Sequence, residues 1–128
     1  MTFVADASAL LAVLLREPDA DWYRAKLDQA EVIWLSPVNW FEVQARIIRL
    51  QGDEGTAEAT TWLEGLGIQI EPITKDQASI AFVALTKYRD RPAKLNLGDC
   101  FAYALAKTKG VPLLYKGDDF KATDLTSA

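Results

Sequence analysis

The sequence contains no histidine among its 128 residues. Histidine is the usual proton carrier near neutral pH, the usual base of a serine or cysteine triad, and the commonest nitrogen ligand of zinc. The one cysteine, Cys100, can form no intramolecular disulfide and, without histidine, no Cys-His nucleophile, so we interpret it as a core residue. Any chemistry here must therefore depend on carboxylates and a metal ion.

The sequence also lacks the segments that divide or anchor a chain. No low-complexity or Pro/Gly/Ser-rich stretch marks a linker, so we expect one compact domain over residues 1–128. The apolar run from Ala7 to Leu15 has no basic leader, and it is shorter than the ~20 residues that a bilayer crossing needs. We therefore expect a cytoplasmic protein that does not associate with a membrane.

Positive charge is in the minority, with 14 lysines and arginines against 18 aspartates and glutamates and a net charge of −4. The molecule as a whole therefore does not attract a polyanion, and contact with nucleic acid needs a local basic patch. The best candidate is residues 87–94, which include Arg89, Arg91 and Lys94. The alternative interpretation is an ordinary solvated loop between two helices.

Short runs of β-branched, aromatic and other apolar residues alternate with helical patterns along the chain. The predicted strands are Phe3 to Ala5, Val32 to Leu35, Ile68 to Ile70 and Val111 to Tyr115. The predicted helices cover residues 8–16, 19–30, 37–50, 56–66, 74–88 and 97 to about 107–110. This alternation predicts a βαβ series and an α/β fold with a mostly parallel sheet.

Three carboxylates stand in apolar surroundings where no lysine or arginine is adjacent. Asp6 ends the first predicted strand, Glu42 lies two turns into the helix that follows Ser36 and Pro37, and Asp99 opens the last helix. Open parallel sheets place their sites at the carboxyl ends of the strands, so these acids can meet at one edge. A fourth acid, Asp118 or Asp119, follows the last strand.

Such a histidine-free acidic cluster suits a hard cation such as Mg²⁺ or Mn²⁺. A water made more acidic by the metal can attack a phosphodiester, while the metal offsets the charge that builds up on the phosphate. We therefore expect hydrolysis of a phosphodiester. Ser8 and Asn39 are candidate supporting residues, because Ser8 follows Asp6 by two residues and Asn39 precedes Glu42 by one helical turn.

Each acid also has a structural explanation. Asp6 is suited to cap the first helix, and Asp99 is a first-turn acid favoured by the helix dipole. Glu42 is placed to pair with Arg46 one turn later, and the doubled acids after the last strand suit an ordinary loop. For the acids to have only structural roles, all of these explanations would have to hold together while the acids still share one edge. We favour this interpretation less than a shared functional site.

Four segments together resemble the PIN-domain proteins of the VapC toxin type. They are residues 4–12 (VADASALLA), 36–43 (SPVNWFEV), 95–107 (LNLGDCFAYALAK) and 113–125 (LLYKGDDFKATDL), in the family's order and over nearly the whole chain. The resemblance implies a three-layer α/β/α sandwich with a central parallel sheet, acting as a Mg²⁺- or Mn²⁺-dependent ribonuclease. Asp6, Glu42 and Asp99 match the family's first three acids and Asp119 the fourth, with Asp118 beside it.

The resemblance also implies a homodimer, a cognate antitoxin that occupies the acidic cleft, and inhibition of translation by cutting RNA. We assign metal binding to Asp6 and Asp99, while Glu42 and Asp119 complete the acidic shell. RNA binding would depend on the metal and on the cations Arg16, Arg89, Arg91 and Lys94, and would weaken as salt rises. An antitoxin arginine can compete for the carboxylates through bidentate pairing.

Two other functions remain open from the sequence. An aspartyl-phosphate phosphatase would use Asp6 as its nucleophile, but such enzymes usually carry a second aspartate two residues later, where this chain has Ser8. A non-catalytic PIN-like module for RNA binding or protein interaction would keep the acids only for a structural ion. Metal titration followed by RNA cleavage assays would separate the scaffold from the nuclease.

Overall fold

Four parallel strands form the middle layer of the molecule. In the computed structural model, which describes residues 1–128, these are β1 (Thr2–Ala5), β2 (Val32–Leu35), β3 (Gln69–Ile70) and β4 (Leu113–Leu114), in the order β3-β2-β1-β4. β1 lies between β2 and β4 and pairs in parallel with both. The predicted parallel sheet is confirmed, although β4 is shorter than the predicted strand from residue 111 to 115.

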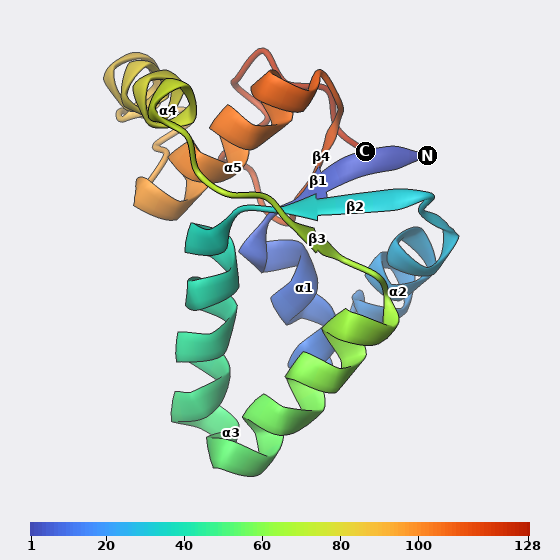
Figure 1. The fold of residues 1–128 in the computed structure, drawn as a ribbon. Coiled ribbons are helices and arrows are strands. Elements are labelled where there is room, and N and C mark those ends of the chain that lie inside the picture. Colours follow the sequence, from blue (N-terminus) through green and yellow to red (C-terminus); the bar gives the residue numbers. More distant parts are fainter.

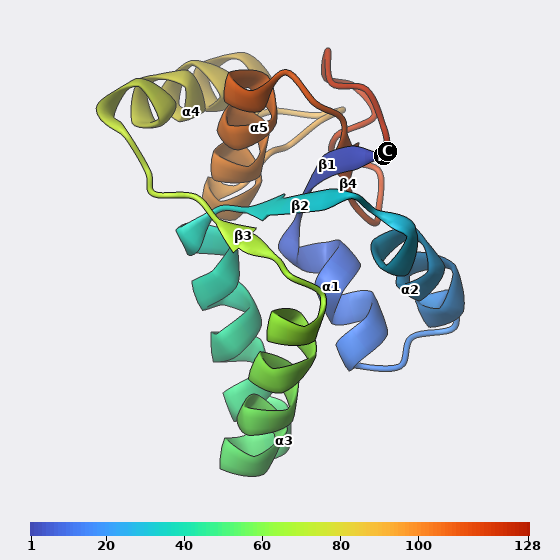
Figure 2. The ribbon, with the colours of Figure 1, turned by 45° about the vertical axis from the view of Figure 1, so that its right-hand side comes forward.

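Five helices cover the two faces of this sheet. They are α1 (Ala7–Leu14), α2 (Ala20–Gln29), α3 (Pro37–Gly65), α4 (Lys75–Tyr88) and α5 (Leu97–Lys109). Figures 1 and 2 show α4 and α5 on one side of the sheet and α1, α2 and α3 on the other. The expected three-layer α/β/α sandwich is therefore present.

The alternation of side chains along the strands builds two separate cores. In β1, Phe3 and Ala5 belong to the core shared with α1, α2 and α3, whereas Val4 belongs to the core under α4 and α5. In β4, Leu114 faces the first core and Leu113 the second. Both faces of β1 and β4 are buried, which explains why their sequences are continuous apolar runs, whereas the edge strand β3 is exposed.

Helix α3 differs most from the sequence prediction. The sequence predicts two helices with a gap over residues 51–55, but the helical segments meet at Gly52, where φ is 69° and ψ is −164°. A left-handed φ of this kind is accessible to glycine without steric cost, so one residue suffices to redirect the chain. Figure 2 shows the two arms of α3 that result.

The helix starts follow the sequence signals closely. Ser36 caps α3, with its Oγ accepting a hydrogen bond from the backbone N–H of Val38, and Pro37 is the first helical residue. At α5, Asn96 is the N-cap and forms a capping box with Asp99. Cys100 is buried, as expected. No helix combines the length and the apolar character that crossing a membrane requires.

Candidate active site

The sheet order brings the predicted acids to one edge. Asp6 follows β1 directly and caps α1, while Glu42 lies in the first arm of α3, which follows β2. Asp99 lies in the first turn of α5, and Asp119 lies in the loop after β4. Because β1 is central, the segments that follow β2 and β4 flank the residue that ends β1 on both sides.

Asp6 is held by a chain of hydrogen bonds that crosses the sheet edge. Its side chain is only 4% exposed, and its Oδ2 accepts from the hydroxyl of Ser8 at 2.6 Å and from the backbone N–H of Ser8 at 3.2 Å. The Ser8 Oγ in turn accepts from the backbone N–H of Lys116 at 2.9 Å. Ser8 therefore links the end of β1 to the segment that follows β4.

Glu42 is oriented by a fully buried amide. Asn39 is 0% exposed, and its Nδ2 donates to Glu42 Oε1 at 2.7 Å and to the carbonyl oxygen of Gly98 at 3.0 Å. The Glu42 carboxylate also packs against Gly98, where an added Cβ would overlap all the carboxyl atoms. Gly98 lies inside α5 with an ordinary backbone, so it is needed here for space and not for conformation.

Asp99 combines a capping role with a place in the acidic cluster. Its Oδ2 accepts from the backbone N–H of Asn96 at 3.0 Å, and the Asn96 side chain accepts from the Asp99 backbone N–H at 2.9 Å. The other carboxyl oxygen has no protein partner and is not sealed from solvent. The structural explanation from the sequence is thus correct for Asp99, but it leaves one oxygen free to bind a ligand.

The acids lie close enough to influence one another's ionisation. Burial raises the pKa of Asp99 to about 7, and the charges of Asp6, Asp119 and Glu42 add to this shift. Burial also raises the pKa of Asp6 despite the hydrogen bonds from Ser8, and the Asp119 charge contributes in the same direction. For Glu42, burial again dominates the rise in pKa, while the Asn39 hydrogen bond opposes it.

No protein cation compensates this cluster. None of Asp6, Glu42, Asp99 and Asp119 forms an ion pair with a lysine or arginine, so the predicted alternative of a Glu42–Arg46 pair is wrong. A buried carboxylate without a counter-charge is costly, and the usual response is a raised pKa or a bound cation. The cluster therefore has the charge and the hard oxygen donors that suit a divalent cation.

The carboxylates do not form a ready-made three-ligand set. No group of three or more acidic, cysteine or histidine side chains is arranged to hold a metal ion. Mg²⁺ usually keeps several waters and binds through one or two carboxylates, so a site built on two carboxylates would not require a third protein ligand. The buried Oδ1 of Asn39, which has no hydrogen-bond partner, is a further unsatisfied oxygen beside the cluster.

The two adjacent acids after β4 have different environments. Asp118 forms an ion pair with Lys121 at 2.7 Å, and this hydrogen bond lowers the pKa of Asp118. Asp119 is exposed, and its charge acts on both Asp6 and Asp99. The structure therefore places Asp119 with the cluster, while Asp118 points its charge toward Lys121.

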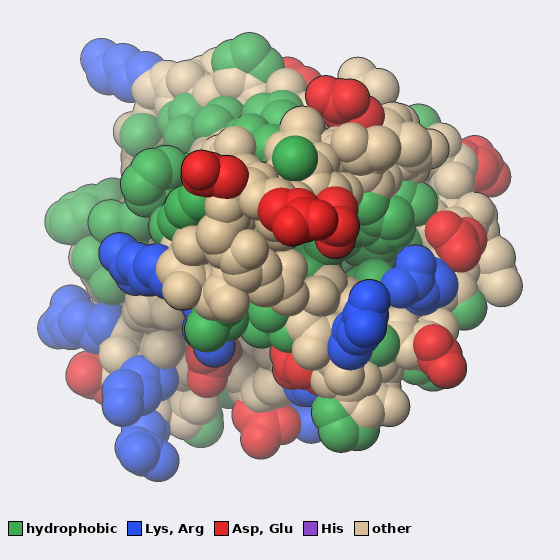
Figure 3. All heavy atoms as spheres, turned by 90° about the horizontal axis from the view of Figure 1, so that it is seen from below, with side chains coloured by type: hydrophobic (Ala, Val, Ile, Leu, Met, Phe, Trp, Pro, Cys, Tyr) green, Lys and Arg blue, Asp and Glu red, His purple; other side chains and the backbone are tan.

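The predicted RNA-binding cations lie on two different parts of the molecule. Arg89, Arg91 and Lys94 lie in the connection between α4 and α5, and Arg16 lies in the connection between α1 and α2, which belong to the opposite layer (Figure 1). Arg16 lines a cavity of about 500 Å³ between α1, α2 and α3. Several acidic side chains lie near the centre of the face in Figure 3, and lysines and arginines lie to the left and to the lower right of them.

Two residues that support the site are not identified by the sequence patterns above. Gly98 appears in the sequence only as a residue near the start of the last helix. A glycine inside a helix, where no turn requires it, often indicates that another group packs closely against the backbone. Lys116 has the sequence context of a loop residue, yet its Nζ contacts both Glu17 and Asp19 at 2.8 Å. Nothing in the sequence marks that pairing, because its partners lie about 100 positions away in the chain.

Comparisons with known proteins agree with this arrangement. A family model described as PIN domain matches residues 3–125. Ribonuclease VapC30 of Mycobacterium tuberculosis is 39% identical over 127 residues, covering 97% of this chain and 96% of the relative. Among solved structures, VapC20 of the same species, a sarcin-ricin loop cleaving toxin, has a TM-score of 0.82 at 17% identity, covering 98% of both chains. A toxin-antitoxin complex from Klebsiella pneumoniae has a TM-score of 0.73 at 19% identity, covering 98% of this chain and 96% of that one.

Proposed function

This chain belongs to the PIN-domain family, and we propose that it is a divalent-metal-dependent endoribonuclease that acts as the toxin of a toxin-antitoxin pair. The observation that carries the proposal is the buried, uncompensated acidic cluster at the carboxyl edge of the sheet. The similarity to VapC ribonucleases over almost the whole chain supports RNA as the substrate. A nuclease of this kind works where RNA is present, so we expect it in the cytoplasm.

In this proposal, Asp6 and Asp99 hold the cation, which is Mg²⁺ or Mn²⁺. When bound, the ion supplies Lewis-acid polarisation of a phosphate oxygen and a more acidic water. Ser8 keeps Asp6 in place through the 2.6 Å hydrogen bond, and Asn39 holds Glu42 across from the first turn of α5. Glu42 and Asp119 complete the acidic shell, where a carboxylate can orient the attacking water or accept its proton.

RNA reaches this edge without help from the overall charge of the protein, which is −4. We expect the residues between α4 and α5, with Arg89, Arg91 and Lys94, to contact backbone phosphates, because that connection leads directly into the α5 turn that carries Asp99. Arg16 would contact a different part of the RNA, since it belongs to the α1–α2 side. These contacts weaken as salt concentration rises.

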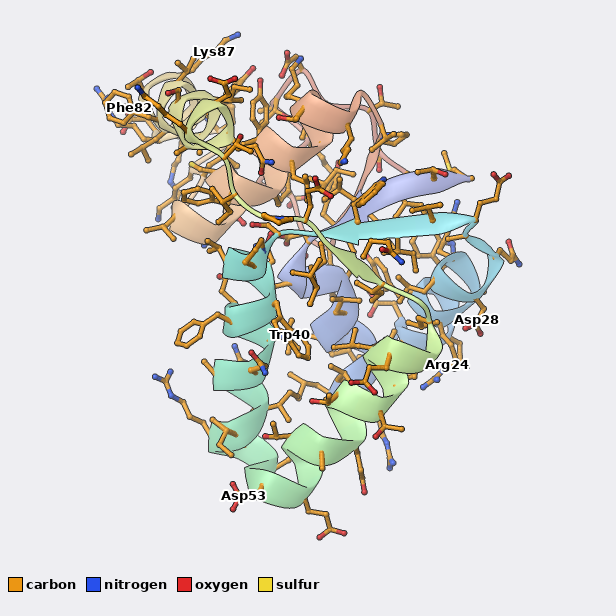
Figure 4. All side chains as sticks on the ribbon, viewed as in Figure 1. Arg24, Asp28, Trp40, Asp53, Phe82 and Lys87 are labelled. Atoms are coloured by element: carbon orange, nitrogen blue, oxygen red, sulfur yellow. The ribbon has the colours of Figure 1, made fainter.

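Two protein partners are part of the proposal. We expect a homodimer through the surface of α4 and α5, where a depression of about 250 Å³ is lined only by apolar residues, including Phe82 and Leu97, which are 65% and 67% exposed. Figure 4 shows Phe82 on the outer side of α4, directed away from the sheet. We also expect a cognate antitoxin, whose arginine can pair with the uncompensated carboxylates and exclude the metal.

The decisive experiment replaces single acids and measures cleavage of total RNA with added Mn²⁺. Asp6→Asn should reduce cleavage by more than about 100-fold, because even outer residues of metal sites cost 10–100-fold when removed. Asp28→Asn is the matched control: it makes the same chemical change on α2, where Figure 4 shows Asp28 at the surface away from the α5 turn. Full cleavage by a folded Asp6→Asn protein would contradict the proposal.

The same assay separates the two acids after β4. Asp119→Asn should reduce cleavage, because its charge acts on Asp6 and Asp99, whereas Asp118→Asn should leave cleavage close to that of the wild type. A chelator should abolish the wild-type reaction, and Mg²⁺ or Mn²⁺ should restore it. A protein that binds Mn²⁺ but leaves every RNA intact would instead favour the non-catalytic scaffold.

A further inference from the structure

The loop that carries Asp119 is fastened to distant parts of the chain at its beginning. The hydroxyl of Tyr23 in α2 donates to the carbonyl oxygen of Tyr115 at 3.0 Å. The next residue, Lys116, donates its backbone N–H to Ser8 Oγ at 2.9 Å. These contacts join the end of β4 to α1 and α2, across more than 90 positions of sequence.

The side chain of Lys116 adds two charge-assisted hydrogen bonds to these connections. Its Nζ donates to Glu17 Oε2 and to Asp19 Oδ1, both at 2.8 Å, so one ammonium bridges two carboxylates of the α1–α2 connection. The hydrogen bonds to Asp19 and Glu17 raise the pKa of Lys116, which keeps the ammonium charged. We call this group of three residues the Lys116 clasp.

The far end of the same loop is anchored in the core. Phe120 is 2% exposed and packs against Tyr115, with the ring centroids 5.1 Å apart. Asp119 is exposed and lies one residue before this anchor. Between the two fixed ends, Gly117 has a φ of 102°, a value that other residues rarely adopt. The position of the Asp119 carboxylate therefore depends on both ends being held.

We propose that Lys116 is a positioning residue for the acidic cluster, and this proposal depends on the metal-dependent nuclease proposed above. The clasp fixes the backbone amide that holds the Ser8 hydroxyl, which in turn holds Asp6 Oδ2. It also fixes the start of the loop that presents Asp119. One ammonium therefore sets the positions of two acids that it does not contact.

The charges of the clasp argue against a direct role of Lys116 in RNA binding. One ammonium and two carboxylates leave a net charge of −1 on the clasp, because the Lys116 charge is more than neutralised by Glu17 and Asp19. A phosphate would have to displace these carboxylates to reach Nζ. Lys121 in the same loop differs, since its ammonium pairs only with the neighbouring exposed Asp118.

The test compares Lys116→Met with Lys121→Met, which removes the same charge from the same loop. For Lys116→Met, we expect hydrogen exchange of the backbone amide at position 116 to be at least about tenfold faster, Mn²⁺ to bind about three- to tenfold more weakly, and kcat to fall about tenfold at unchanged KM for RNA. Lys121→Met should match the wild type in all three. Lys116→Arg should restore most of the loss, because a guanidinium can also bridge two carboxylates.

Several results would overturn the proposal. If Lys116→Met raises KM and leaves exchange and Mn²⁺ affinity unchanged, the lysine contacts RNA directly. If it lowers only the melting temperature, its role is merely structural. If Lys116→Met does not fold, the double variant Glu17→Gln/Asp19→Asn removes the clasp while retaining the lysine, and wild-type Mn²⁺ affinity in that variant equally contradicts the proposal.

Failure of the nuclease proposal gives a different pattern. A wild-type protein that neither binds Mn²⁺ nor cleaves RNA would refute that proposal, whereas the exchange rate at position 116 would still report whether the clasp holds the loop. Normal wild-type activity with an unaffected Lys116→Met variant would refute the clasp alone.

Discussion

Helix α5 carries one aspartate, Asp99, and contacts another, Asp124, and their environments shift their pKa values in opposite directions. Asp99 lies in the first turn of α5. Because it is buried and lies near three other acids, its pKa rises to about 7. Asp124, which contacts the later turns, accepts from Lys107 at 2.8 Å and from Tyr103 at 2.7 Å, and its pKa falls to about 2. The Asp124 group ties the C-terminal segment to α5 and stabilises the fold, whereas the Asp99 carboxylate lowers stability when it is ionised, because no protein cation faces it.

The largest expected contrast is between Asp99→Asn and Asp124→Asn. Asp99→Asn should lose more than about 100-fold in RNA cleavage while its metal-free melting temperature near pH 8 stays equal or rises, because an uncompensated charge is removed. Asp124→Asn should cleave RNA normally but lose about 1 kcal/mol of stability, a small value because this half-exposed pair is screened by solvent. Thermal unfolding and single-turnover cleavage would check both.

The reverse outcome for Asp99→Asn would show that Asp99, like Asp124, has only a structural role. If Asp99→Asn unfolds while retaining its cleavage rate per folded molecule, the acidic cluster is a structural element, and Asp99 serves only in the capping box with Asn96.

A smaller effect is expected from one added methyl group beside Glu42. Gly98→Ala places a Cβ onto the Glu42 carboxylate, so Glu42 must move away from its bond with Asn39, and cleavage should fall about 10–100-fold. Gly65→Ala is the matched control, because a Cβ added there, at the end of α3, would meet nothing within 4 Å. It should keep activity and gain up to about 1 kcal/mol from helix propensity. Equal activity of the two variants would show that the Glu42 position is unimportant.

The smallest expected effect is a pH dependence of metal affinity. A carboxyl group whose folded pKa is raised contributes stability below its unfolded pKa, near 3.9, and loses that contribution as pH rises through the folded value, here about 7. The metal-free protein should therefore become less stable over this window. Mn²⁺ binds the deprotonated carboxylate, so its affinity should increase about tenfold between about pH 6 and about pH 8.

Calorimetric titration of the wild type and Asp99→Asn at both pH values would measure this linkage. The variant should show a flatter pH dependence, because the group with the pKa of about 7 is gone. Identical pH dependence in the two proteins would mean that a different group controls the proton release.

The sequence predicts the parts of this molecule that depend on local patterns. Strand ends place Asp6 and the loop of Asp119, and the capping signals of Ser36 and Asn96 fix where Glu42 and Asp99 lie along their helices. These features depend on short-range chemistry and on the parallel sheet, so the meeting of the acids at one edge was foreseeable.

The remaining features depend on contacts between distant segments. The close approach of Glu42 to Gly98 and the bridge from Lys116 to Glu17 and Asp19 form only when separate layers are packed together. No local pattern records which side chains will meet. The separation of Arg16 from the α4–α5 cations has the same origin, because it follows from the two-sided covering of the sheet.

The alternation of β1 between the two cores limits how this protein can change. A one-residue insertion or deletion before Asp6 would exchange Phe3 and Val4 between the helical layers and turn the acid away from its neighbours at the same time. An insertion or deletion in β1 would therefore disrupt the core packing and the acidic cluster together. Changes in specificity have to arise instead at the helix ends and in the connections.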